Sequence, residues 1–99
     1  MADLSDVFAH IDANADRYVG DLQRLLRQPS VAAQGLGIAE CAELTAAILR
    51  EHGFRAEVMA SDGNPVVYGE IDGASDKTLL FYNHYDVQPA EPLELWDSP

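Results

Sequence analysis

An uninterrupted apolar segment, Thr78 to Tyr82, constrains the fold of this chain more than any other feature of its sequence. A strand with one face in water alternates apolar and polar side chains, whereas a continuously apolar strand is typical of a sheet covered on both faces. The sequence therefore predicts a strand here, within an α/β domain that has layers on both sides of its sheet. Two helices from this chain can cover one face, so we expect further protein to cover the other.

Helical periodicity dominates the first half of the chain. Apolar residues recur at three- and four-residue steps from Leu4 to Leu26, which predicts one long amphipathic helix. Pro29 should end this helix, because the residue before a proline is driven out of helical geometry. A second helix is expected from about Ile38 to His52, with Gly53 as its left-handed C-terminal residue.

The alternating segment 54–59 predicts a half-exposed strand, and the segment 66–71 predicts a second strand, both ahead of the apolar one. A turn-rich link joins them, so an antiparallel pair is the simplest arrangement. The order of elements is thus two helices followed by three strands, without an internal repeat.

Charge and composition exclude several classes of partner. Seventeen acidic and six basic residues give a net charge of −11, which disfavours nucleic acid and anionic membranes as partners. No apolar run approaches the length of a membrane span, and the acidic start lacks an apolar signal segment. These features predict a cytoplasmic protein. The single cysteine, Cys41, lies in a helical pattern and is expected to be buried rather than reactive.

His84 and Asp86 directly follow the apolar segment and form the strongest candidate site. Residues two apart in an extended chain point to the same side, so the two side chains should share one space. Open α/β sheets place their ligand crevices at that end of the strands. A metal-bound imidazole commonly donates its other N–H to a carboxylate, and a His-x-Asp triplet supplies that pair. The alternative is a loop histidine capped by a nearby acid.

The residues from Tyr82 to Pro89, Tyr-Asn-His-Tyr-Asp-Val-Gln-Pro, resemble the first metal-binding motif of carnosinase-like dipeptidases in metallopeptidase family 20. That family also includes acetylornithine deacetylase, succinyl-diaminopimelate desuccinylase, aminoacylase and glutamate carboxypeptidase. The resemblance extends to the helix end before Pro29 and Ser30, to the helix exit at Gly53, and to Trp-Asp-Ser-Pro at 96–99. His-Tyr-Asp-Val-Gln-Pro is fairly specific to the dipeptidase branch, since the deacetylases more often carry His-x-Asp-Val-Val-Pro.

This resemblance implies a fold, a cofactor and two residue roles. The fold is the amino-terminal part, residues 1–99, of a three-layer α/β/α zinc-peptidase catalytic domain. His84 would bind one zinc ion of a two-zinc centre, and Asp86 would be the active-site carboxylate that holds its imidazole. The remaining ligands, the catalytic glutamate and a smaller lid or dimerisation domain would lie beyond Pro99. A homodimer of the full-length protein is one expectation.

The remaining candidate residues favour structural roles. His10 lies within the first helical pattern, and His52 lies in the last turn of the second helix. Glu91 and Glu94 belong to a proline-rich loop and are expected to be solvated acids. Trp96 is expected to be a packing anchor rather than part of a substrate pocket. The sequence lacks serine-nucleophile and phosphate-binding motifs.

Together these features predict the amino-terminal fragment of a zinc-dependent dipeptidase that hydrolyses dipeptides or small N-acyl amino acids. The 99-residue chain alone should be inactive, because a zinc site needs about three or four protein ligands and only His84 is identifiable. One alternative is an acetylornithine- or succinyl-diaminopimelate-type deacylase of the same family. Another is a small non-catalytic α/β domain in which His84 and Asp86 form a capped turn.

Overall fold

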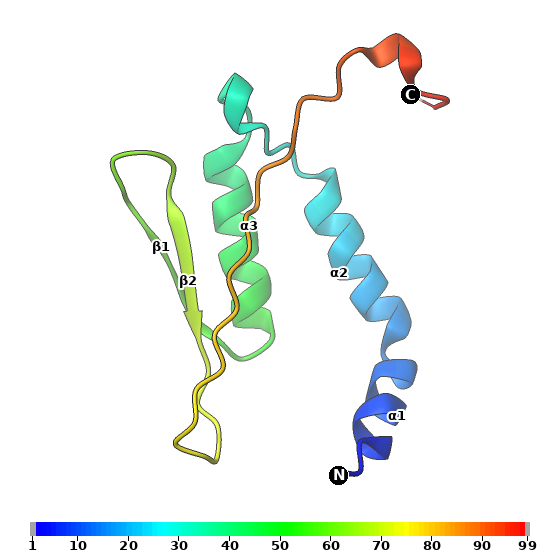
Figure 1. Ribbon diagram of the computed structural model, residues 1–99, viewed down its shortest axis with the longest axis vertical. Helices are drawn as coiled ribbons and strands as arrows, with labels where there is room; N and C mark the ends of the chain where they lie inside the picture. The colour runs from blue at the N-terminus through cyan, green and yellow to red at the C-terminus, as the bar shows by residue number, and fades with distance from the viewer. Residues whose placement is uncertain (1, 99) are drawn as a thin grey trace.

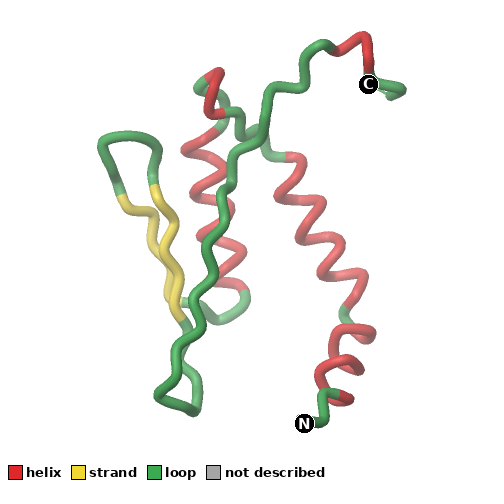
Figure 2. Tube along the Cα trace, in the orientation of Figure 1, coloured by secondary structure: helices red, strands yellow, loops and turns green. Residues whose placement is uncertain are grey.

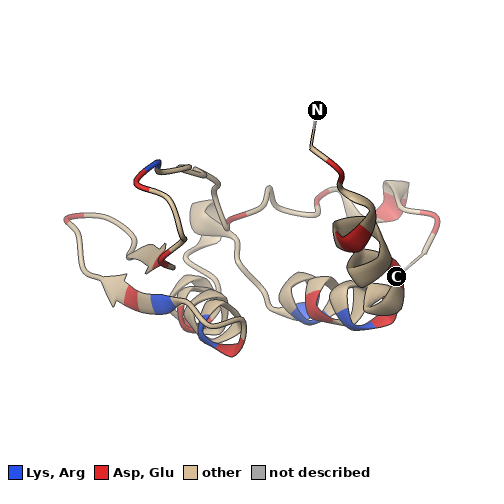
Figure 3. Ribbon diagram, turned by 90° about the horizontal axis from the view of Figure 1, so that it is seen from below, with Lys and Arg blue, Asp and Glu red and all other residues tan. Residues whose placement is uncertain are grey.

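The computed structural model describes residues 2–98, and its elements form a helical arm beside a helix that packs on a β-hairpin (Figure 1). In chain order the elements are α1 (Ser5–Ala13), α2 (Ala15–Arg27), the 3₁₀ helix η1 (Ala32–Gln34), α3 (Ile38–Glu51), β1 (Arg55–Met59), β2 (Val66–Glu70) and the 3₁₀ helix η2 (Leu93–Leu95). Figures 1 and 3 both place α3 between the hairpin and α2. The expected helices and the first two strands are therefore present.

The prediction of a single long helix at the amino terminus is wrong in one respect, because Asn14 divides this helix into α1 and α2. The Asn14 side-chain amide donates to the carbonyl oxygen of His10 at 2.8 Å, and its backbone N–H contacts the same oxygen at 3.1 Å. Asparagine side chains compete with the backbone for such carbonyls and interrupt helices in this way. The expected end before Pro29 is confirmed, since α2 stops at Arg27.

Helix α3 supplies the buried core of the described residues. Its predicted bounds are confirmed to within one residue, and Gly53 takes the expected left-handed conformation with φ of 89°. Four small or medium apolar residues are buried at helical spacing: Ile38, Cys41, Ala42 and Ala46. The expectation of a buried Cys41 is thus confirmed.

The two strands pair antiparallel, as expected, and one face of the pair lies against α3. Ala56 pairs with Gly69 and Val58 with Val67 in the observed register. A Cβ atom at Gly69 would lie 2.9 Å from a methyl group of Leu49, so helix and sheet approach closely there. This close approach fixes the hairpin on α3.

The prediction of a third strand at 78–82 is wrong for this structure. Residues 71–92 run as one long loop (Figure 2), and no strand of the described residues pairs with them. The side chains from Leu79 to Tyr82 are between 76% and 89% exposed. The apolar pattern signals a segment suited to a covered sheet. A strand also needs hydrogen-bonding neighbours, which residues 2–98 do not provide.

Acidic residues are spread over the described chain. Figure 3 marks the positions of Asp and Glu on helices, strands and loops alike, in agreement with the net charge of −11. Among the described helices, none combines the length and the apolar character needed to cross a bilayer.

Candidate metal centre

The structure brings the side chains of His84 and Asp86 together. The Nδ1 atom of His84 lies 3.0 Å from Oδ1 of Asp86 and 2.9 Å from the backbone oxygen of the same residue. Both atoms facing Nδ1 are acceptors, so Nδ1 carries the proton and donates it. The lone pair of the neutral ring is then on Nε2.

The imidazole of His84 is open to solvent. Its side chain is 76% exposed and that of Asp86 is 45% exposed. Nε2 makes no hydrogen bond to any of the residues that the structure describes. A ring held at Nδ1 by a carboxylate and open at Nε2 has the arrangement in which histidine binds a metal ion.

A complete metal site is not formed by the described residues. No group of three or more His, Cys, Asp or Glu side chains that could hold an ion occurs within residues 2–98. Structural and catalytic zinc sites use about three or four protein ligands. His84 therefore fits a metal ion as one ligand of a set, and the residues that the structure describes do not supply the rest.

The backbone around the pair is tied to two earlier parts of the chain. The N–H of Val87 donates to the carbonyl oxygen of Ser30 at 2.8 Å, in the loop before α3. The thiol of Cys41 on α3 donates to the carbonyl oxygen of Tyr85 at 3.8 Å. The loop that carries the pair is thus attached to the buried end of α3.

The other residues considered from the sequence lie away from this pair. His10 is exposed on α1, with its ring 6.3 Å from that of Tyr18. Glu91 and Glu94 are exposed, as expected, with Glu91 in the loop before η2 and Glu94 within η2. Trp96 is 62% exposed and donates from its indole N–H to the carbonyl oxygen of Ala90 at 2.9 Å.

Two side-chain contacts between α2 and the end of α3 have no signature in the sequence. Arg24 donates two hydrogen bonds to the carboxylate of Glu51, at 2.8 and 3.0 Å. The Nε2 atom of His52 lies 3.0 Å from Oδ2 of Asp21. The partners are 27 and 31 residues apart, so only the packing of the helices reveals them. His52 accordingly serves helix packing.

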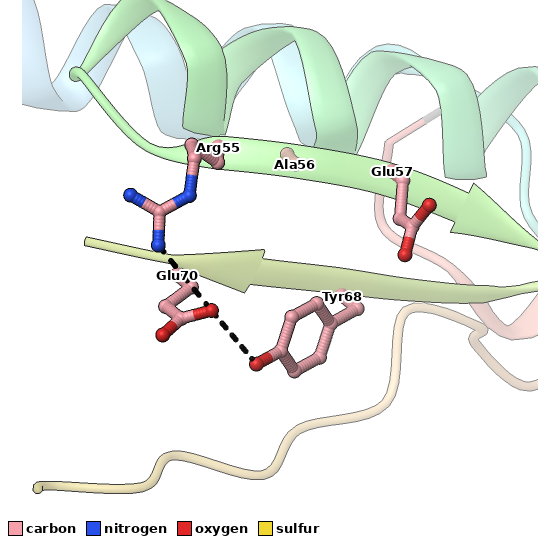
Figure 4. Close-up of a pocket in the computed structure, with 5 residues that line it drawn as sticks. All are labelled: Arg55, Ala56, Glu57, Tyr68 and Glu70. Atoms are coloured by element: carbon pink, nitrogen blue, oxygen red, sulfur yellow. Dashed lines mark hydrogen bonds and ion pairs between the residues drawn. The ribbon is translucent and has the colours of Figure 1, made fainter. Parts of the chain in front are cut away.

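A shallow hollow on the open face of the hairpin holds a second group of charges (Figure 4). Arg55 lies 3.4 Å from the carboxylate of Glu70, and the hydroxyl of Tyr68 donates to the same carboxylate at 3.2 Å. The bond to Glu70 raises the pKa of Tyr68 above its usual value, because it holds the phenol in its protonated form. These groups satisfy one another and offer no open ligand.

Known proteins include several that are similar to this chain. No protein-family model matches the chain. The chain is 30% identical to a Cys-Gly metallodipeptidase of Schizosaccharomyces pombe, over 96% of this chain and 23% of that protein. It is 39% identical to a succinyl-diaminopimelate desuccinylase of Aromatoleum aromaticum, over 76% of this chain and 18% of that protein.

A solved structure supports the same relationship. The M20 family metallo-carboxypeptidase Sso-CP2 from Sulfolobus solfataricus is 42% identical, with a TM-score of 0.71, over 78% of this chain and 18% of that one. The chain therefore spans about a fifth of the length of the relatives it matches. Agreement in both sequence and fold shows that this chain matches an amino-terminal part of the α/β domain of M20 family metallopeptidases.

Proposed function

We propose that this chain supplies the first metal-binding pair of an M20-type zinc hydrolase, with His84 as a zinc ligand and Asp86 as the carboxylate that orients it. The observation that carries the proposal is the 3.0 Å contact between Nδ1 of His84 and Oδ1 of Asp86, on a ring that is otherwise exposed. M20 metallopeptidases depend on a metal cofactor. Zinc is the metal proposed, because it binds neutral imidazole readily.

Each residue of the pair has a distinct task. Asp86 accepts the Nδ1 proton of His84, which selects one tautomer and directs the Nε2 lone pair outward. The negative charge of the carboxylate also makes the ring a stronger electron donor. When bound, zinc supplies Lewis-acid polarisation of a scissile carbonyl group.

The proposed reaction is hydrolysis of an amide bond in a dipeptide or a small N-acyl amino acid. A dipeptide substrate is supported by the Cys-Gly metallodipeptidase, whose alignment extends over 96% of the chain. The desuccinylase has the higher percentage of identical residues, 39% over a shorter alignment, which supports removal of an acyl group as the second candidate. Both candidates use the same pair and differ only in the substrate.

Zinc binding by the chain itself tests the role of His84. We expect zinc, added during an NMR titration, to shift the ring signals of His84 with micromolar or weaker affinity, since one ligand is present. His84→Ala should abolish the site, and Asp86→Ala should weaken it by about 10- to 100-fold. His10→Ala is the control, because His10 is an exposed histidine on α1. Zinc binding that survives in the His84 variant would contradict the proposal.

A chimera tests the catalytic role. The matching segment of the Sulfolobus metallo-carboxypeptidase would be replaced by this chain, which its 42% identity makes feasible. We expect the chimera to bind metal and hydrolyse amides, and His84→Ala to remove one metal equivalent and nearly all turnover. A folded chimera that keeps its full metal content without His84 would exclude this residue as a ligand.

A further inference from the structure

Tyr85 lies between the two residues of the proposed metal pair and points away from them. Its side chain is half-buried, and its hydroxyl donates a hydrogen bond to the carbonyl oxygen of Pro65, at the start of β2. Its own carbonyl oxygen accepts a hydrogen bond from the thiol of Cys41. Tyr85 is therefore attached to the hairpin through its side chain and to α3 through its backbone.

These attachments matter because the surrounding loop has few others. Within residues 78–90, every hydrogen bond to an earlier part of the described chain involves either Tyr85 or Val87. No neighbouring strand of residues 2–98 holds this segment in place. The orientation of the loop at 84–86 thus depends on a very small number of contacts.

The acceptor of the Tyr85 hydroxyl is itself well fixed. Pro65 has a restricted φ angle. It follows a turn in which Ser61 bonds both the N–H of Gly63, at 3.1 Å, and the carbonyl oxygen of Asn64. The bond from the Tyr85 hydroxyl to this acceptor is therefore a fixed point for the loop.

We propose that Tyr85 is a positioning residue, which holds the backbone so that His84 and Asp86 project together on the opposite side. Alternation along an extended chain places the flanking side chains on one face only while the backbone keeps its geometry. Rotation at 84–86 would separate the imidazole from the carboxylate, and the bond to Pro65 opposes that rotation. The functional importance of this positioning rests on the role as a zinc ligand proposed above for His84.

Replacement of the hydroxyl alone tests the proposal. In the metal-free chain, we expect Tyr85→Phe to speed hydrogen exchange at the Val87 amide by about five- to tenfold, the effect of losing one ordinary hydrogen bond. The ¹⁵N signals of the His84 ring should move toward a mixture of tautomers, because Nδ1 loses its fixed acceptor. Amides of α3 should keep their exchange rates, which separates local positioning from general loss of stability.

Tyr82→Phe is the matched control, since Tyr82 is 89% exposed and forms no hydrogen bond within the described residues. It should leave both the Val87 amide and the His84 ring unchanged. Unaltered His84 ring signals in Tyr85→Phe, equal effects of the two substitutions, or an unprotected Val87 amide in the parent chain would each overturn the proposal. Because the measurement is made without metal, its failure is distinct from failure of zinc binding by His84.

Discussion

The ion pair between Arg24 and Glu51 is the best-defined contact between α2 and α3. The two hydrogen bonds from the guanidinium lower the pKa of the Glu51 carboxyl below its ordinary value of 4.5. A lowered pKa means that folding favours the carboxylate. The pair therefore adds stability above the ordinary pKa, and this contribution is lost as the pH falls through the lowered value. Both side chains are more than two-fifths exposed, so the contribution is small.

Removal of the Arg24 guanidinium should raise the pKa of the Glu51 carboxyl. We expect Arg24→Gln to raise the pKa of the Glu51 carboxyl toward 4.5, as measured by a carbon-detected NMR titration. Arg27→Gln removes the same charge from the last turn of α2 and is the control, because Arg27 forms no ion pair within the described residues. Equal shifts in the two variants would show that net charge, rather than the pair, lowers the pKa of Glu51.

Sequence separation decides which of these residue contacts could be predicted. His84 and Asp86 are two positions apart, and the geometry of an extended chain alone brings them to one side. Arg24 and Glu51 lie on different helices, and their contact depends on how α2 and α3 pack. The bond from Tyr85 to Pro65 could not be predicted without the position of the hairpin.

Gly37 controls the junction between α2 and α3 at the scale of the elements. It lies directly before α3 with φ of 71°, a left-handed conformation that side chains disfavour. A Cβ atom at this position would also collide with the carbonyl oxygen of Pro29, which follows α2. The close approach of the two chain segments thus requires glycine.

Substitution at Gly37 separates collision from backbone strain. Gly35 is also left-handed, with φ of 60°, yet a Cβ there would meet open space. We expect Gly35→Ala to cost about 1–2 kcal/mol from strain alone. Gly37→Ala should cost about 1–3 kcal/mol more, because the collision forces the backbone to move. Urea unfolding of both variants measures the difference, and equal losses would exclude a tight junction at Pro29.

The elements that sequence predicts correctly are those with local causes. Pro29 ends α2, Gly53 terminates α3, and alternation marks β1. The break at Asn14 has a local cause too. However, the apolar pattern continues regularly on both sides of this asparagine, so the sequence does not predict the break. The prediction for segment 78–82 depends on something outside the segment. Its apolar pattern indicates that other protein layers cover it, and does not by itself determine that it forms a strand.

At the scale of the whole molecule, the described residues combine a small apolar core with many exposed large apolar side chains. Four buried apolar residues, all on α3, form the core of the described chain. Open apolar surfaces include the loop segment 79–82 and one side of the α1–α2 arm, where Phe8, Leu22 and Leu26 are each more than half exposed. Contiguous open apolar surface marks a place where other protein packs.

A dye that binds exposed apolar surface tests this property of the molecule. We expect the chain to enhance the fluorescence of 8-anilinonaphthalene-1-sulfonate, and a Leu80→Lys, Phe81→Lys double variant to reduce that enhancement strongly. Each substitution should change the free energy of unfolding by no more than about 0.5 kcal/mol, because exposed side chains lose little on replacement. Leu36→Lys, in the loop before α3, controls for the added charge. If the double variant unfolds or dye binding is unchanged, residues 79–82 are already covered in solution, and the loop conformation between β2 and η2 would have to be abandoned.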